Sequence, residues 1–118
     1  MPSTTDKASS LTLDALCDLV LDTLQCTEPI SREYAMVALA DIATFDRKQR
    51  DYGPTNIAAF GEVGVLVRVN DNIARLRNML WDNPNHNPCH EGVEDSWMDL
   101  SVYGVIARLC RRKLWPRT

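Results

Sequence analysis

The stretch VGVLVRVNDNIARLRNML, residues 63–80, decides the fold class of this chain. Valines alternate with other residues at its start, and a β-strand over 63–69 would show the same alternation. Apolar residues nevertheless keep recurring every three or four positions as far as Leu80, with charged residues on the opposite side. Because only the helical period accounts for the whole stretch, we predict a helix over residues 56–81.

Three further helices are predicted on either side of this one, over residues 11–25, 31–51 and 91–113. Gly53 and Pro54 end the second helix, because glycine favours a helix C-terminus and proline cannot continue the helix. Four helices with short connections predict an all-α, four-helix bundle-like single domain over residues 11–118. The polar residues 1–10 are predicted to form a flexible tail.

Composition and charge exclude several classes of protein. The 118 residues include 13 Lys and Arg against 16 Asp and Glu, a formal net charge of −3, which argues against direct nucleic-acid binding. No apolar run approaches the roughly 20 residues of a membrane span, and no apolar signal region follows the start. The four cysteines form no C-x-x-C pair, as expected of thiols in a reducing compartment. We therefore expect a cytoplasmic protein with no membrane partner.

An acidic column on the fourth predicted helix gives the clearest chemical signal. Glu91, Asp95 and Asp99 are spaced four residues apart, and the same column continues into Val102 and Ile106, which we expect in the core. Buried carboxylates repel one another unless cations balance them, and Mg²⁺ is a cation that prefers oxygen ligands. The alternative is that acids merely favour the start of a helix. That alternative explains Glu91 better than it explains Asp99, which lies more than two turns into the helix.

Other charged groups allow a functional and a plain structural interpretation. Arg68, Asp71 and Arg75 could present an ionic face to phosphate, or could form ordinary ion pairs on an exposed helix. Three possible zinc ligands lie together near one loop but lack a suitably spaced fourth: His86, Cys89 and His90. A second acidic column is predicted to face solvent, and it consists of Asp14, Asp18 and Asp22.

Three blocks of sequence resemble a known family in their order and spacing. The blocks are K-x-x-D-Y-G from Lys48, V-R-x-x-D with R-L from Val67, and E-x-x-E-D-x-x-x-D-L-x-x-Y from Glu91. Over residues 44–110 the chain resembles the nucleotide modification associated domain type 1 family of bacteriophages and their hosts. That family is in turn similar to the all-α nucleoside triphosphate pyrophosphatases, the MazG and dimeric dUTPase group.

The resemblance implies a MazG-like fold and a Mg²⁺-dependent (or Mn²⁺-dependent) enzyme that hydrolyses a (d)NTP to (d)NMP and pyrophosphate. It implies catalytic carboxylates at Glu91, Asp95 and Asp99. The expected metal ligands are these three together with Glu94, Asp71 and Glu62, and the expected substrate-binding residues are Lys48, Tyr52, Arg68, Arg75 and Tyr103. In a phage-encoded protein this chemistry would take place in the host cytoplasm.

A non-catalytic nucleotide-sensing or protein-binding module is the alternative function. The chain lacks the E-E-x-x-E motif of the pyrophosphatases, and Asn72 stands where the family usually has lysine. In either case the fourth helix is apolar on almost every side, so we expect it to be largely buried. We also predict a homo-oligomer, most simply a dimer.

Overall fold

The computed structural model describes residues 11–83 and 90–116, with the side chains of His90 and Glu91 left out. Within these residues the chain is all-α and contains no strand, which confirms the predicted fold class of a helical, bundle-like protein. The predicted tail at 1–10 lies outside the described residues. None of the described helices combines the length and the apolar composition that crossing a membrane requires.

The chain forms two compact units, Met1–Thr44 and Phe45–Thr118. The first contains α2, Leu13–Thr23, and most of α3, Ile30–Tyr52. The second contains the end of α3, then α4 (Thr55–Arg77), the π-helical turn η1 (Asn78–Asp82) and α5 (His90–Arg111). The predicted single domain over residues 11–118 remains a prediction.

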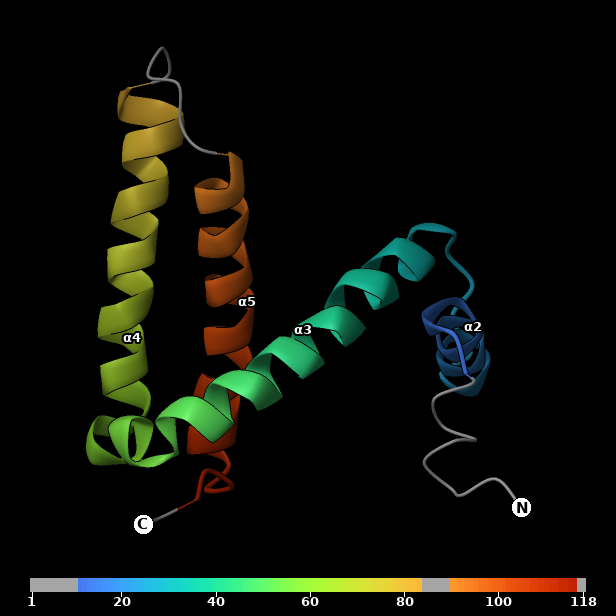
Figure 1. Cartoon of the computed structure of the whole chain (residues 1–118), viewed down its shortest axis with the longest axis horizontal. Coiled ribbons are helices and arrows are strands. Elements are labelled where there is room, and N and C mark those ends of the chain that lie inside the picture. Colours follow the sequence, from blue (N-terminus) through green and yellow to red (C-terminus); the bar gives the residue numbers. More distant parts are fainter. Residues whose placement is uncertain (1–10, 84–89, 117–118) are drawn as a thin grey trace. The chain divides into compact units, whose positions relative to one another are not determined.

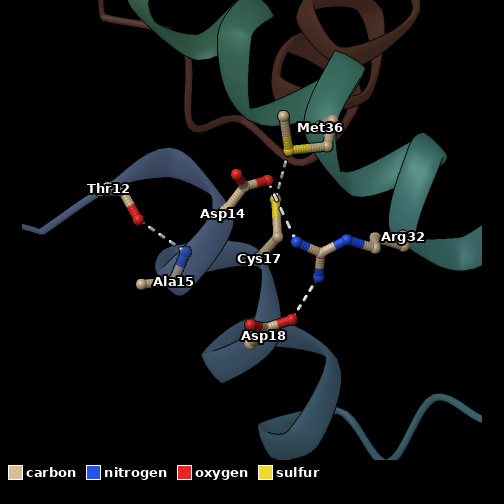
Figure 2. Close-up of polar contacts among 7 residues, drawn as sticks. All are labelled: Thr12, Asp14, Ala15, Cys17, Asp18, Arg32 and Met36. Atoms are coloured by element: carbon tan, nitrogen blue, oxygen red, sulfur yellow. Dashed lines mark hydrogen bonds and ion pairs between the residues drawn. The ribbon is translucent and has the colours of Figure 1, made fainter.

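In the first unit, a side chain caps the N-terminus of α2, and a contact between two sulfur atoms joins α2 to α3. The Oγ1 of Thr12 accepts a hydrogen bond from the backbone N–H of Ala15 at 3.0 Å, which satisfies one of the free donors of the first turn. The fully buried thiol of Cys17 donates to Met36 Sδ at 3.2 Å (Figure 2). A small thiol and a flexible thioether suit close packing between two helices.

The acidic column of α2 faces solvent as predicted, since Asp14, Asp18 and Asp22 are all exposed, and two of its members also share one cation of α3. Figure 2 shows the guanidinium of Arg32, on α3, between Asp14 and Asp18. Its Nη2 lies 3.1 Å from Asp14 Oδ1, and its Nη1 hydrogen-bonds Asp18. The hydrogen bond and charge of Asp18, followed by those of Asp14, raise the pKa of Arg32. One cation thus offsets the repulsion between carboxylates four residues apart.

In the second unit, α4 and α5 lie side by side around a small core (Figure 1). Ile57, Val65 and Ile106 form the buried centre. Two half-buried aromatic rings extend this core: Phe45 meets Trp115 edge-on at 6.1 Å between centroids, and Trp115 Nε1 donates to the carbonyl of Pro54 at 3.1 Å. This hydrogen bond links the turn between α3 and α4, at Pro54, to the segment that follows α5.

The predicted helix over 56–81 is correct in type but is interrupted twice. Gly61 has φ 60° and ψ −147°, a conformation almost restricted to glycine, and it kinks α4. The last predicted turn is the π-helix η1. Gly64 is explained by a close approach, since a Cβ there would lie 2.5 Å from Phe60 Cβ. No such approach occurs at Gly61, where a Cβ would meet nothing within 4 Å.

The fourth helix is less buried than its composition predicts. Ile106 is buried, but Trp97 and Val105 are more than half exposed, and most other large apolar residues of α5 are only partly covered. The reason is that α5 has one neighbouring helix along most of its length, namely α4. Burying an all-round apolar helix requires neighbours on several sides.

Candidate functional site

Three helical segments of the second unit surround a cavity of about 250 Å³, which we call the Lys48 cleft. The last turns of α3 supply Lys48, Gln49 and Tyr52, the first turn of α4 supplies Asn56, and α5 supplies Asp99 and Tyr103. Apolar side chains complete its lining: Phe45, Ile57, Val102 and Ile106.

The local sequence explains why these side chains converge. Lys48 and Tyr52 are four residues apart, as are Asp99 and Tyr103, so each pair lies on one face of its helix. Gly53 then takes a positive φ of 69°, and its N–H donates to the carbonyl of Gln49 at 2.8 Å. This left-handed residue ends α3 and lets the chain turn immediately into α4.

The charged centre of the cleft is an ion pair. Lys48 Nζ lies 3.3 Å from Asp99 Oδ1, across 51 positions of sequence. The Asp99 side chain is 29% exposed and that of Lys48 is 44% exposed, so both remain accessible to a ligand. A partly exposed pair of this kind stabilises a fold only slightly. Its cation and carboxylate are therefore available for other partners at little cost in stability.

The structure brings four of the predicted site residues into this cleft: Lys48, Tyr52, Asp99 and Tyr103. Arg68 lies beside it rather than in it, because Arg68 Nη2 donates to Asn56 Oδ1 at 2.6 Å while Asn56 itself lines the cleft. The same arginine borders a second, mainly apolar cavity of about 350 Å³ at the kink of α4. Arg75 is exposed and lines neither cavity.

The predicted acidic ligands are dispersed in the part of the chain that the structure describes. Glu62 pairs with Arg111 at 3.0 Å, and Asp71, Glu94 and Asp95 are exposed. Among the described residues, no group of three or more His, Cys, Asp and Glu side chains is placed to hold a metal ion. The side chains of Glu91 and of the alternative zinc ligands His86, Cys89 and His90 lie outside the described residues.

The expected burial of the acidic column is wrong for Asp95 and half right for Asp99. The buried line of α5 passes through Ser96, whose Oγ donates to the carbonyl of Gly92 at 2.9 Å. Both aspartates lie beside that line. The end of α3 contacts Asp99 through Lys48, whereas Asp95 is exposed, one turn nearer the start of α5.

Gln49, Asn56 and the apolar side chains also line the cleft, although they were not predicted as site residues. Asn56 comes two residues after the Gly53-Pro54 turn. A polar residue so close to the turn that ends α3 was the sequence feature that could have indicated a site residue here. Asn72, where the resembled family has lysine, is buried on the face of α4 that carries Val65 and Leu76. Its small amide therefore suits helix packing at this position.

Comparison with known proteins identifies no family for this chain. No protein-family model, characterised protein or solved structure matches the chain.

Proposed function

We propose that the chain binds a nucleoside triphosphate in the Lys48 cleft and, as a MazG-like pyrophosphohydrolase, cleaves it to the monophosphate and pyrophosphate. One observation carries the proposal. A cation, a carboxylate and two tyrosines, all singled out by the resemblance, line a single cavity: Lys48, Asp99, Tyr52 and Tyr103. The activity belongs in the cytoplasm, or in the host cytoplasm for a phage protein.

Each side chain has a role that its chemistry supports. The Lys48 ammonium offers three donors to phosphate oxygens, and the tyrosine rings offer flat faces and hydroxyl groups to a base or sugar. A bound phosphate chain would compete with Asp99 for Lys48 and would free a carboxylate oxygen. Nucleotide binding would thus convert an internal ion pair into two separate ligand contacts.

The donor set of the cleft fits Mg²⁺ bound together with a nucleotide. Mg²⁺ is commonly held by one or two carboxylates plus substrate phosphates, so a cage of protein ligands is not required. Asp99 would supply the carboxylate within the cleft, and Asp95 is the next acid along α5. When bound, the metal polarises the phosphoryl group and lowers the pKa of the attacking water.

A specific observation favours the non-catalytic alternative, in which the cleft binds nucleotide without hydrolysis. Among the described acids, only Asp99 lines the cleft, and Glu62 is engaged by Arg111. With the side chains that the structure describes, the cleft can bind a metal–nucleotide complex but has no second acid to orient water.

Pyrophosphate release separates the two functions. Each dNTP and NTP is incubated with the protein and Mg²⁺ or Mn²⁺, beside Asp99→Asn and the exposed control Asp46→Asn, which does not line the cleft. An enzyme releases pyrophosphate from at least one nucleotide, loses this activity in Asp99→Asn and keeps it in Asp46→Asn. A binding module releases none while nucleotide still raises its melting temperature. Neither release nor a thermal shift with any nucleotide would contradict both functions.

A further inference from the structure

The helix α4 has two apolar faces, of which α5 covers one. The covered face carries the buried residues Val65, Asn72 and Leu76. At about 100° per residue, a second row lies roughly a third of a turn away around the helix. Its members, separated by three, four and three positions, are Val63, Leu66, Asn70 and Ile73, and all four are exposed. We call this row the α4 seam.

Exposed apolar side chains on both sides of the seam add to the area that a partner could cover. An aromatic side chain buries roughly 150–250 Å², so Phe60 and Trp81, both about three-quarters exposed, leave on the order of 300 Å² uncovered. The exposed aliphatic side chains of the seam, with Val67 and Leu80, bring the total to the order of the 800 Å² that each partner contributes to a stable interface. Part of this area lies in two grooves, one at the kink of α4 with Phe60, Val63 and Val67, and one against α5 with Ile73, Leu80 and Trp81.

We propose that the α4 seam is the contact with a second copy of this chain, in a parallel, two-stranded, coiled-coil-like pairing. Alternating three- and four-residue intervals are the spacing of such pairs. In the heptad notation Val63 and Asn70 take position a, while Leu66 and Ile73 take position d. A single asparagine at position a is a recognised determinant of two-stranded pairing and register.

Asn70 is the residue that favours an identical, parallel partner. In a parallel pair each residue meets its own equivalent across the two-fold axis, so Asn70 meets Asn70 of the partner subunit. An amide carries both donors and an acceptor, so two identical amides can satisfy each other. An antiparallel pair would set Asn70 against an aliphatic position d and leave its amide without a partner.

Arg77 takes the next position a, and its charge is compatible with this pairing because it lies at the end of the seam. It is the last residue of α4, and its guanidinium stacks on the ring of Trp81 at 5.2 Å from the centroid. This stacking holds the guanidinium of Arg77 near the C-terminal end of α4. In a dimer the two Arg77 charges would therefore lie at the solvent-exposed end of the paired helices. The pairing does not depend on nucleotide binding in the Lys48 cleft.

Oligomeric state tests the proposal, with a variant and a control matched in exposure. Light scattering after gel filtration at tens of micromolar should give a dimer for the wild type. Ile73→Glu should give a helical monomer by circular dichroism, because it places two carboxylates at facing positions. Val105→Glu, on α5, should remain a dimer, since Val105 is 52% exposed and Ile73 is 51% exposed.

Asn70→Leu provides a second test that does not depend on a disruptive charge. Replacing the polar residue should raise the melting temperature of the assembly or give assemblies larger than a dimer, because the asparagine limits both. A monomeric wild type would overturn the proposal. A dimer that survives Ile73→Glu, or an Asn70→Leu variant unchanged in mass and melting temperature, would overturn it as well.

Discussion

Replacing Gly61 with alanine should destabilise the protein, although alanine is the better helix former. The backbone there has φ 60° and ψ −147°, and side-chain-bearing residues held in such regions cost about 1–3 kcal/mol. A new Cβ would meet nothing within 4 Å, so the loss comes from the backbone alone. For a chain of this length, about 2 kcal/mol corresponds to a fall in melting temperature of roughly 8 °C.

Gly104→Ala is the matched control, because Gly104 lies in regular helix on the exposed side of α5. A Cβ at this position also meets nothing within 4 Å, and no positive φ opposes it. The substitution should therefore stabilise the protein by about 1 kcal/mol, as in an ordinary helix interior. The free energies of unfolding come from thermal and urea melts followed by circular dichroism.

The two alanine variants should move the melting temperature in opposite directions. A rise for Gly61→Ala similar to that of Gly104→Ala would mean that α4 runs straight through residue 61 in solution. That result would refute the kink. It would also change how the first turn of α4, with Asn56, reaches the Lys48 cleft.

Two further predictions concern single side chains. Burial, followed by the charge of Glu62, raises the pKa of the Cys110 thiol, so less of this thiol is thiolate at any given pH. Iodoacetamide should therefore modify the exposed Cys26 before Cys110, and the pH at which Cys110 begins to react should be displaced upward, as read from peptide mass spectra. Trp115→Phe should cost at most about 1 kcal/mol in urea melts, because it loses the hydrogen bond to Pro54, whose carbonyl still accepts the N–H of Ala58 at 3.0 Å.

The helices could be predicted from sequence because apolar spacing is a property of each segment alone. The apolar recurrence through Leu80 was enough to reject a strand at 63–69. Interruptions were not predictable in the same way, since a glycine within a helical pattern is compatible with regular helix or with a break. Gly61 breaks α4, whereas Gly104 lies in regular helix, and only the backbone conformation distinguishes the two.

Four residues of the candidate site were expected from the family resemblance, and they line the same cleft: Lys48, Tyr52, Asp99 and Tyr103. Each helix can bring its pair to one cleft because the two residues are four positions apart. Contacts between helices were not predictable, because they depend on which face meets which neighbour. The two acidic columns show this limit, because spacing did not predict their partners. Asp14 and Asp18 face solvent as predicted but also pair with Arg32 of the adjacent helix, and Asp99 pairs with Lys48.

Calorimetry shows whether the Lys48 cleft binds the phosphates of a nucleotide. Each of the four common dNTPs, in a form that cannot be cleaved between the α and β phosphates, is titrated with Mg²⁺ into wild type, Lys48→Met and Arg47→Met. Arg47 is the neighbouring exposed cation on α3 and does not line the cleft.

Wild type and Arg47→Met should bind at least one dNTP with the same Kd. Lys48→Met should bind that nucleotide at least tenfold more weakly, a loss of about 1.4 kcal/mol. Equal affinity in wild type and Lys48→Met, or no binding of any dNTP by the wild type, would mean that the Lys48 cleft is not a nucleotide site.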